Sequence, residues 1–330
     1  MPQLGGGRRK VLVSLASFFI AIAGFTVVYE SIAHIRYYHW KSTFDNQGWF
    51  GKITTPSSNK ILMWEYRPYG AFKEIQTNRF GFRESDQVTT NKPDRTYRIA
   101  FIGDSVTLGI GIQNHFIFVR LFEISVNRDR VGPQVQALNF SVDGYNTIQI
   151  SEMLRSKVLP FVPDKVVYVL CLNDFDFSES SGRKIRYFKK PNSFLMERLD
   201  QVQRRLLNVS YYHYHFDKNR EKVFREILSI KQLLDKKGIS FQVVIAPILA
   251  DAPLNNYPLL TIHQTIRGFL KHHKIESYDL LDCFQARKQP LKAYAYDIWH
   301  PNELGHRVIA SALSRAVRPY HQIADQTQIP

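Results

Sequence analysis

The chain has 330 residues, and 44% of them are hydrophobic, which is enough for a buried core and excludes an intrinsically disordered protein. Its 44 Lys and Arg residues outnumber 29 Asp and Glu residues, so the net charge of +15 suits an acidic polymer or anionic lipid as a neighbour. Nucleic acid is not expected, because no zinc spacing, RNA-binding signature or heptad repeat accompanies the basic residues. Two cysteines, Cys171 and Cys283, are too few for a disulfide framework.

The amino terminus predicts a membrane anchor. Residues 1–10 form a basic tail that contains Arg8, Arg9 and Lys10, and residues 11–29 carry no charge, which is long enough for a transmembrane helix. The basic flank predicts a cytoplasmic amino terminus and a domain outside the cytoplasm, on the periplasmic or external side of a bacterial membrane. A cleaved signal peptide is the alternative, since residues 21–23 read Ala-Ile-Ala. The apolar run continues beyond them, which favours an uncleaved signal-anchor.

The rest of the chain divides by composition into a connection, a domain and a tail. Residues 30–76 are expected to be a juxtamembrane connection, 77–318 the domain and 319–330 a tail. Within the domain, residues 175–219 form a long basic and aromatic insertion. This insertion is interpreted as a lid over the site, a surface against anionic lipid, or a segment that only packs on the domain.

Apolar runs and helical patterns alternate along the domain. Short apolar runs predict five strands, at residues 99–102, 134–140, 166–172, 241–245 and 277–281. Periodic apolar spacing predicts helices at residues 116–126, 147–158, 220–237, 261–273 and 304–317. This alternation indicates an α/β fold with three layers and a parallel sheet of about five strands. His263, His272 and His273 have no metal-binding spacing and are expected on the surface, so neither a metal nor another cofactor is predicted.

Polar residues follow three of the predicted strands and recur before the last helix. Ser105 follows the first strand, and sites in such folds lie outside the carboxyl ends of the strands. A serine nucleophile needs a base and a group that orients the base, which His300 and Asp297 can supply from one loop. The Ser105 N–H, the Gly144 N–H and the Asn173 amide are candidates for an oxyanion hole.

These residues resemble the motifs of the SGNH hydrolase superfamily, the GDSL-like esterases. Its four blocks are matched in order by Gly103-Asp104-Ser105, Gly144, Asn173-Asp174 and Asp297-Ile298-Trp299-His300-Pro301. The resemblance implies a flavodoxin-like sheet between helices, Ser105 as nucleophile, His300 as base, Asp297 as its orienter, and Ser105, Gly144 and Asn173 as oxyanion donors. One departure is Cys171, where the third block usually has glycine, which bears on the setting of Asn173. The α/β-hydrolase alternative fails because no Gly-x-Ser-x-Gly elbow is present.

The expected activity is therefore hydrolysis of an O-acyl ester, with O-acetyl on a cell-envelope glycan as the leading substrate. An O-acetyltransferase that uses the same triad is the first alternative, and it would need a membrane partner that delivers an acyl donor. A lipid ester is also open as substrate, because the anchor would bring the site near the bilayer. The second alternative is a catalytically silent module that binds a glycan or lipid through the basic insertion.

Overall fold

The computed structural model describes residues 5–46, 52–128, 132–177, 190–206, 210–249, 256–287 and 289–317. These residues belong to two compact units. The helical unit comprises Met1–Phe50 and Glu179–Val209, and the sheet unit comprises Gly51–Ser178 and Ser210–Pro330. The predictions for residues 1–4, for residues 178–189 and 207–209 of the insertion, and for the tail at 319–330 lie outside the described residues.

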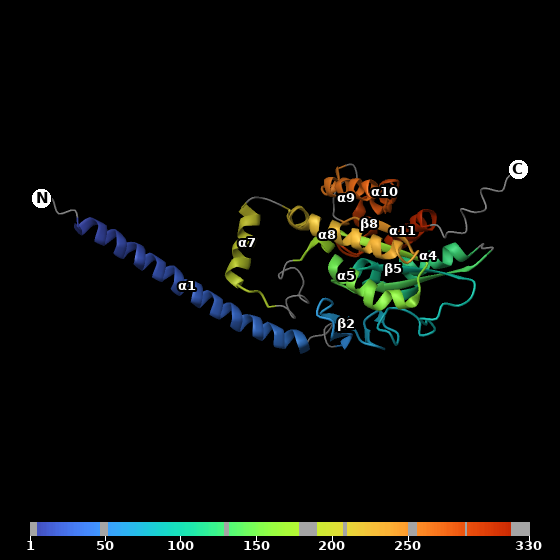
Figure 1. Cartoon of the computed structure of the whole chain (residues 1–330), viewed down its shortest axis with the longest axis horizontal. Helices are drawn as coiled ribbons and strands as arrows, with labels where there is room; N and C mark the ends of the chain where they lie inside the picture. Colours follow the sequence, from blue (N-terminus) through green and yellow to red (C-terminus); the bar gives the residue numbers. More distant parts are fainter. Residues whose placement is uncertain are drawn as a thin grey trace. The chain divides into compact units, whose positions relative to one another are not determined.

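A parallel sheet of five strands forms the centre of the sheet unit (Figure 1). Its strands, in spatial order, are β6 (Gln134–Ser141), β5 (Thr96–Gly103), β7 (Lys165–Cys171), β8 (Ser240–Ala246) and β9 (Glu276–Asp279). By order along the chain this is the flavodoxin-like sequence 2-1-3-4-5, in which the direction of winding changes between β5 and β7. The predicted fold class is confirmed.

Helices cover both faces of this sheet. They are α3 (Ser105–Leu108), α4 (Phe118–Asn127), α5 (Thr147–Met153), α8 (Tyr211–Asp235), α9 (Leu260–His272), α10 (Leu280–Gln285) and α11 (Glu303–Ala316). Shorter helical segments are Asn114–Phe116, Leu154–Val158, Leu159–Phe161, Leu172–Phe175 and Leu291–Tyr294. α4 packs against α11, and α5 packs against α8. Right-handed crossovers place these two pairs on opposite faces, because β6 and β7 lie on opposite sides of β5.

The predicted elements differ from the observed ones mainly at their ends and before residue 96. Two hairpins lie in the expected connection: β1 (Thr54–Pro56) with β2 (Trp64–Tyr66), and β3 (Ala71–Phe72) with β4 (Ile75–Gln76). These hairpins belong to the same compact unit as the sheet, so the described part of this unit includes residues before Thr77. Strands of two or three residues are too short to show an alternating pattern, although Trp64, Tyr66 and Ile75 in them are buried.

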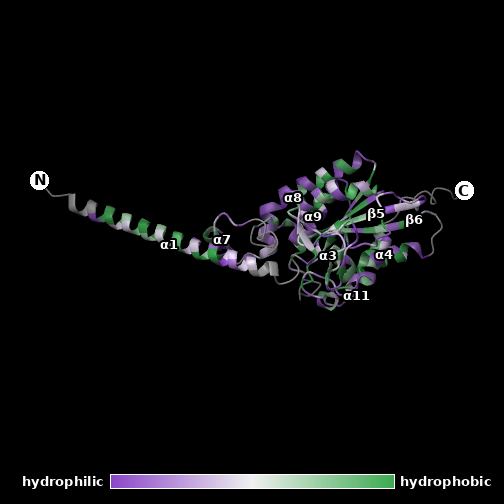
Figure 2. Ribbon diagram, turned by 90° about the horizontal axis from the view of Figure 1, so that it is seen from below, coloured by the Kyte–Doolittle hydropathy of each residue, from purple (hydrophilic) through white to green (hydrophobic). Residues whose placement is uncertain are grey.

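The helical unit contains two described helices, α1 (Gly5–Asn46) and α7 (Phe194–Leu206). α1 extends beyond the predicted span of residues 11–29 in both directions. It is the one helix in the described part of the chain that is long and apolar enough to cross a membrane. Its apolar side chains are exposed, and Figure 2 shows hydrophobic colour along most of its length. α7 lies inside the basic insertion, which was not assigned a helix.

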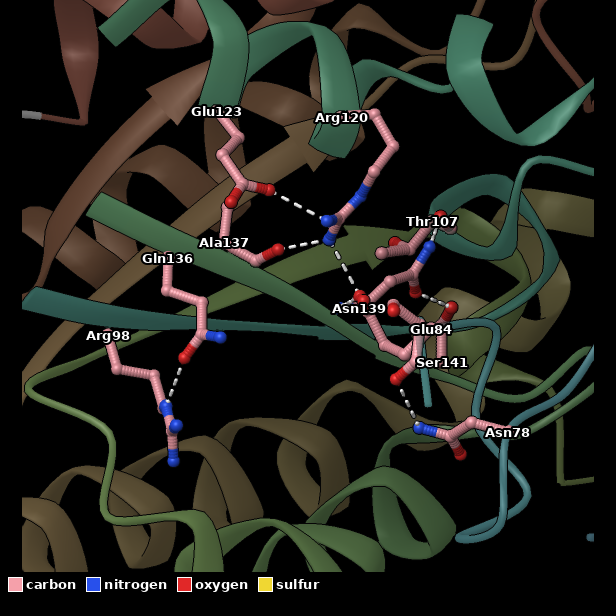
Figure 3. Close-up of polar contacts among 11 residues, drawn as sticks. Asn78, Glu84, Arg98, Thr107, Arg120, Glu123, Gln136, Ala137, Asn139 and Ser141 are labelled. Atoms are coloured by element: carbon pink, nitrogen blue, oxygen red, sulfur yellow. Dashed lines mark hydrogen bonds and ion pairs between the residues drawn. The ribbon is translucent and has the colours of Figure 1, made fainter. Parts of the chain in front are cut away.

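A buried polar network ties the segment after the hairpins to the sheet (Figure 3). Glu84 accepts hydrogen bonds from Arg120 of α4 at 2.7 Å and from the backbone N–H of Asn139 at 2.6 Å. The Asn139 amide in turn donates to the carbonyl of Thr107, two residues after the candidate nucleophile, at 2.8 Å. Burial raises the pKa of Glu84 to about 7 despite the charge of Arg120. The loop, α4 and β6 are thus held together behind α3.

Two histidines are fully buried, and His263 was expected on the surface. His263 is fully buried rather than exposed, and its Nδ1 lies 2.9 Å from the carboxylate of Asp279 at the end of β9. The pairing depends on how α9 packs against β9, which helical spacing does not reveal. His306 of α11 is also fully buried, and its Nδ1 accepts the N–H of Phe118 at the start of α4, at 3.1 Å.

The burial of His306 predicts an acid-dependent loss of stability. Burial, helped by the charge of Arg83, lowers the pKa of His306 to about 3, from 6.5 in an unfolded chain. Below pH 6.5 the imidazole is protonated in the unfolded state but stays neutral in the native state, so stability falls as pH decreases. Between pH 8 and pH 5, His306 is expected to lower the free energy of unfolding by about 2 kcal/mol. Urea unfolding of the parent and of His306→Gln at both pH values measures it.

The raised pKa of Glu84 also affects stability in this pH range, but in the opposite direction. The parent and His306→Gln are therefore compared by the change in their unfolding free energy. We expect the unfolding free energy of His306→Gln to fall less between pH 8 and pH 5 than that of the parent. His272→Gln, which changes an exposed histidine at the end of α9, is expected to behave as the parent. Equal losses in the parent and in His306→Gln would contradict the assignment.

Candidate active site

The structure brings Ser105, His300 and Asp297 together in the arrangement of a catalytic triad. Ser105 begins α3 directly after β5, at the point where the winding of the sheet changes. Its Oγ lies 2.9 Å from Nε2 of His300, across 195 residues of sequence. Nδ1 of His300 lies 2.8 Å from Oδ2 of Asp297. A serine in this position can lose its proton to the imidazole while the carboxylate holds the ring.

The loop from Asp297 to His300 fixes its own carboxylate. Oδ1 of Asp297 accepts the backbone N–H groups of Trp299 and His300, both at 2.8 Å, while Oδ2 faces the imidazole. Partial burial opposes ionisation, but the hydrogen bonds from His300 and from these N–H groups hold the pKa of Asp297 below its usual value. Asp297 is therefore ionised at neutral pH and keeps the Nδ1–H tautomer of His300, which leaves Nε2 free to accept a proton. Asn302 caps α11 directly after this loop, with its side chain accepting the N–H of Gly305.

Three neighbouring segments are fastened to three consecutive residues at the end of β5. Val142, after β6, donates its N–H to the carbonyl of Gly103 at 3.3 Å. The Asn173 side chain, after β7, donates to Oδ2 of Asp104 at 2.7 Å. His300 approaches Ser105 from the carboxyl-terminal loop. The candidate residues from distant parts of the sequence therefore meet at one turn.

The predicted oxyanion donors are available at this turn. Within the part of the chain that the structure describes, the backbone N–H groups of Ser105 and Gly144 form no hydrogen bond. Gly144 has a φ of +75°, a left-handed conformation that favours glycine. One N–H of the Asn173 amide is used by Asp104, which leaves the other for a substrate. Donors with no partner in the free protein are what a developing oxyanion requires.

The cysteine in the third block does not disturb the backbone. Cys171 has φ −98° and ψ 154°, an extended conformation that any residue adopts, so the place does not need glycine. Its thiol donates to Oδ1 of Asp104 at 3.3 Å, on the carboxylate that holds Asn173. Asp174 is fully buried and accepts hydrogen bonds from Tyr168 and from the N–H of Cys171. Burial and the charge of Asp104 raise the pKa of Asp174, so its position under the site is structural.

Two residues that were not predicted to have a role support the site. Arg83 is fully buried, and its guanidinium donates to the carbonyls of Leu108, Gly109, Ile112 and Glu74, which fixes the turn after α3. A buried arginine is stable only with such partners.

The second is Tyr212 at the start of α8, within the stretch expected to be an insertion. Nε1 of Trp299 donates to its hydroxyl at 2.6 Å, so α8 holds the loop that carries Asp297 and His300. Burial raises the pKa of Tyr212 to about 12, which keeps the hydroxyl neutral. The pair is separated by 87 residues, and no local pattern predicts it.

The described residues offer no cluster of metal ligands. Among the described residues, no group of three or more His, Cys, Asp or Glu side chains is arranged to hold a metal ion.

The comparison with family models agrees with these motifs. The model of the GDSL-like lipase/acylhydrolase family matches residues 101–308. Among solved structures, the chain is similar to the acetylxylan esterase Axe2 of Geobacillus stearothermophilus, with 15% identity, 67% of this chain and 94% of that chain covered, and a TM-score of 0.47. A member of the lipolytic protein G-D-S-L family of Veillonella parvula has 14% identity, coverages of 66% and 97%, and a TM-score of 0.42. The search of curated proteins gives no match.

Proposed function

The chain belongs to the GDSL-like lipase/acylhydrolase family, and from this premise we propose that it hydrolyses an O-acyl ester through an acyl-enzyme on Ser105. The observation that carries the proposal is the line of contacts from Ser105 Oγ through His300 to Asp297, at 2.9 and 2.8 Å. We propose O-acetyl groups on a cell-envelope glycan as the substrate. The polar surroundings of Ser105 and the net charge of +15 support a small acyl group on an acidic polymer.

In the acylation step, Ser105 Oγ attacks the ester carbonyl while its proton passes to Nε2 of His300. The carbonyl oxygen becomes an oxyanion, which the N–H groups of Ser105 and Gly144 and the Asn173 amide stabilise. The ester bond then breaks, and the imidazolium returns the proton to the departing alcohol oxygen. Asp297 stabilises the imidazolium in the interval without taking a proton itself.

In the deacylation step, water occupies the place of the departed alcohol. His300 removes its proton, the resulting hydroxide attacks the acyl carbonyl, and the same donors hold the second oxyanion. Breaking the bond to Oγ releases the carboxylic acid and restores the Ser105 hydroxyl. A sugar hydroxyl in place of water would give the O-acetyltransferase reaction with the same residues.

We also propose that α1 crosses a membrane with its amino terminus in the cytoplasm. The exposed apolar surface of this helix and the basic residues Arg8, Arg9 and Lys10 support that orientation. The domain that contains Ser105 would then act outside the cytoplasm, where envelope glycans are exposed.

A fluorophosphonate probe tests for an activated serine in the full-length protein in detergent. We expect the parent to be labelled and Ser105→Ala to remain unlabelled, because the probe reacts with a serine whose proton a neighbouring base can accept. Ser156→Ala, which removes an exposed serine of the helical segment Leu154–Val158, should label as the parent. Absence of labelling in folded parent protein would refute an acyl-enzyme on Ser105.

The acyl group and the acceptor are then determined separately. Hydrolysis of p-nitrophenyl esters of increasing chain length is expected to be fastest for acetate. Release of acetate from acetylated glycan in water indicates the hydrolase, whereas acetylated oligosaccharide formed at the expense of acetate release indicates the transferase. Fastest turnover of long acyl chains would favour a lipid ester instead.

A further inference from the structure

The helix α7 carries an apolar stripe that faces away from the rest of the helical unit. Leu195, Leu199, Val202 and Leu206 recur at intervals of four, three and four residues, which places them on one face of the helix. Apart from Leu195, which is half-buried, these side chains are exposed, by 50% for Leu199, 37% for Val202 and 81% for Leu206. Met196 beside them is 64% exposed. Four large exposed apolar side chains on thirteen residues indicate a surface that another apolar phase covers.

The amino-terminal end of α7 is fastened to α1 by a carboxylate. Glu30 of α1 accepts hydrogen bonds from the Ser193 hydroxyl at 2.6 Å, from the Phe194 N–H at 3.1 Å and from the Leu195 N–H at 2.9 Å. Both helix N–H groups would otherwise lack an intrahelical acceptor, and a negative charge at this end of a helix is favourable. The contact fixes where α7 starts relative to α1.

Aromatic packing strengthens this junction. The Phe194 ring is buried, 5.0 Å from the ring of His34 and 5.8 Å from that of Tyr37, one and two turns of α1 beyond Glu30. The charge-free segment of α1 ends at residue 29, so α7 begins where the apolar part of α1 stops. From there α7 is steeply inclined to α1 rather than running along it (Figure 1).

We propose that α7 is an interfacial helix whose stripe, formed by Met196, Leu199, Val202 and Leu206, inserts into the outer leaflet of the bilayer. The inference rests on the proposed membrane-spanning role of α1. A helix that leaves the end of a membrane span and presents one apolar face has the geometry of a helix lying in the plane of the interface. At 1.5 Å per residue, α7 covers about 20 Å of that plane.

The basic residues of α7 support lipid as the partner of its apolar stripe. Arg198 and Arg205, seven residues apart and both exposed, lie beside the apolar stripe. Long basic side chains in this place reach the lipid phosphates while their methylene groups remain near the acyl chains. On this proposal, α7 is a membrane-facing element within the insertion at residues 175–219.

Lipid quenching of a fluorophore tests this placement in the full chain. Leu199→Cys is labelled with bimane and reconstituted into nanodiscs of phosphatidylcholine and phosphatidylglycerol, with or without lipids that carry a nitroxide near the headgroup. We expect the nitroxide lipids to remove most of the fluorescence at position 199. The native cysteines are both buried, and the unsubstituted chain, treated in the same way, gives the background from labelling at Cys171 and Cys283.

Two further positions separate this inference from the anchor proposal. Ile20→Cys lies on the exposed apolar surface of α1 and is expected to be quenched by lipids with a nitroxide deep in the acyl chain. Glu221→Cys, on an exposed face of α8, is expected to be unaffected. If position 20 is quenched and position 199 behaves as position 221 does, α7 faces protein and the inference is wrong. If position 20 is not quenched, the anchor proposal fails and the inference fails with it.

Discussion

His300→Ala is expected to lower kcat for p-nitrophenyl acetate by about 10⁶-fold, the loss typical of removing the base from a serine triad. Without the imidazole, no group within 3 Å can accept the proton of Ser105 Oγ, since the other neighbour, the Asp104 carboxylate, lies 3.3 Å away and is already occupied by three donors. Residual turnover above the rate in water would come from the oxyanion donors, which the substitution leaves in place. Steady-state kinetics of the purified protein measures the change.

The companion variants show whether His300 and Ser105 act as one unit. Ser105→Ala should lose about as much activity as His300→Ala, and the double variant should lose no more, because residues of one triad are strongly non-additive. His272→Ala, which removes an exposed histidine, should keep the parent rate. Losses that multiply in the double variant would indicate two independent contributions and would argue against the proposed mechanism.

Asp297→Asn is expected to lower kcat by about 10⁴-fold while the fold is retained. The amide oxygen can still accept the N–H groups of Trp299 and His300, but its NH₂ then faces Nδ1 of His300 in place of a carboxylate oxygen. That contact requires Nδ1 to be an acceptor, so the ring proton moves to Nε2, which can no longer take the proton of Ser105. Turnover at pH 7 to 8 gives the loss, and circular dichroism checks the fold.

The matched control is Glu303→Gln, which makes the same chemical change on an exposed carboxylate at the start of α11, three residues after His300. It should leave kcat within about twofold of the parent, because surface charges contribute little. If Asp297→Asn also kept activity within tenfold of the parent, Asp297 would not be the group that orients His300.

Much of the sheet unit is predictable from local patterns. The strands β5, β7 and β8 are continuous apolar runs because helices bury both faces of a parallel sheet, and such runs are easily recognised. Ser105, Asn173 and Gly144 were located because each follows a strand, and the carboxyl ends of parallel strands share one edge. Asp297 and His300 lie in one short loop, so their contact is local.

The features that were not predicted depend on contacts between distant segments. The four hydrogen bonds of Arg83 reach residues between 9 and 29 positions away, and Tyr212 contacts Trp299 across 87 residues. α7 was not predicted because the sequence around it is dense in charged and aromatic residues. A short helix with exposed leucines resembles a basic loop in composition. His263 was misplaced because polar residues are ordinarily exposed, and only its pairing with Asp279 makes burial favourable.

The distance in sequence between Ser105 and His300 has a consequence for biosynthesis. Chains emerge from the ribosome amino terminus first, so β5 and the serine turn leave it long before the loop that carries the base. Until that loop has arrived and α11 has docked, Ser105 is an ordinary alcohol. A nascent chain that lacks this loop therefore lacks the complete triad, so on the proposed mechanism turnover is expected only once translation of the domain is nearly complete.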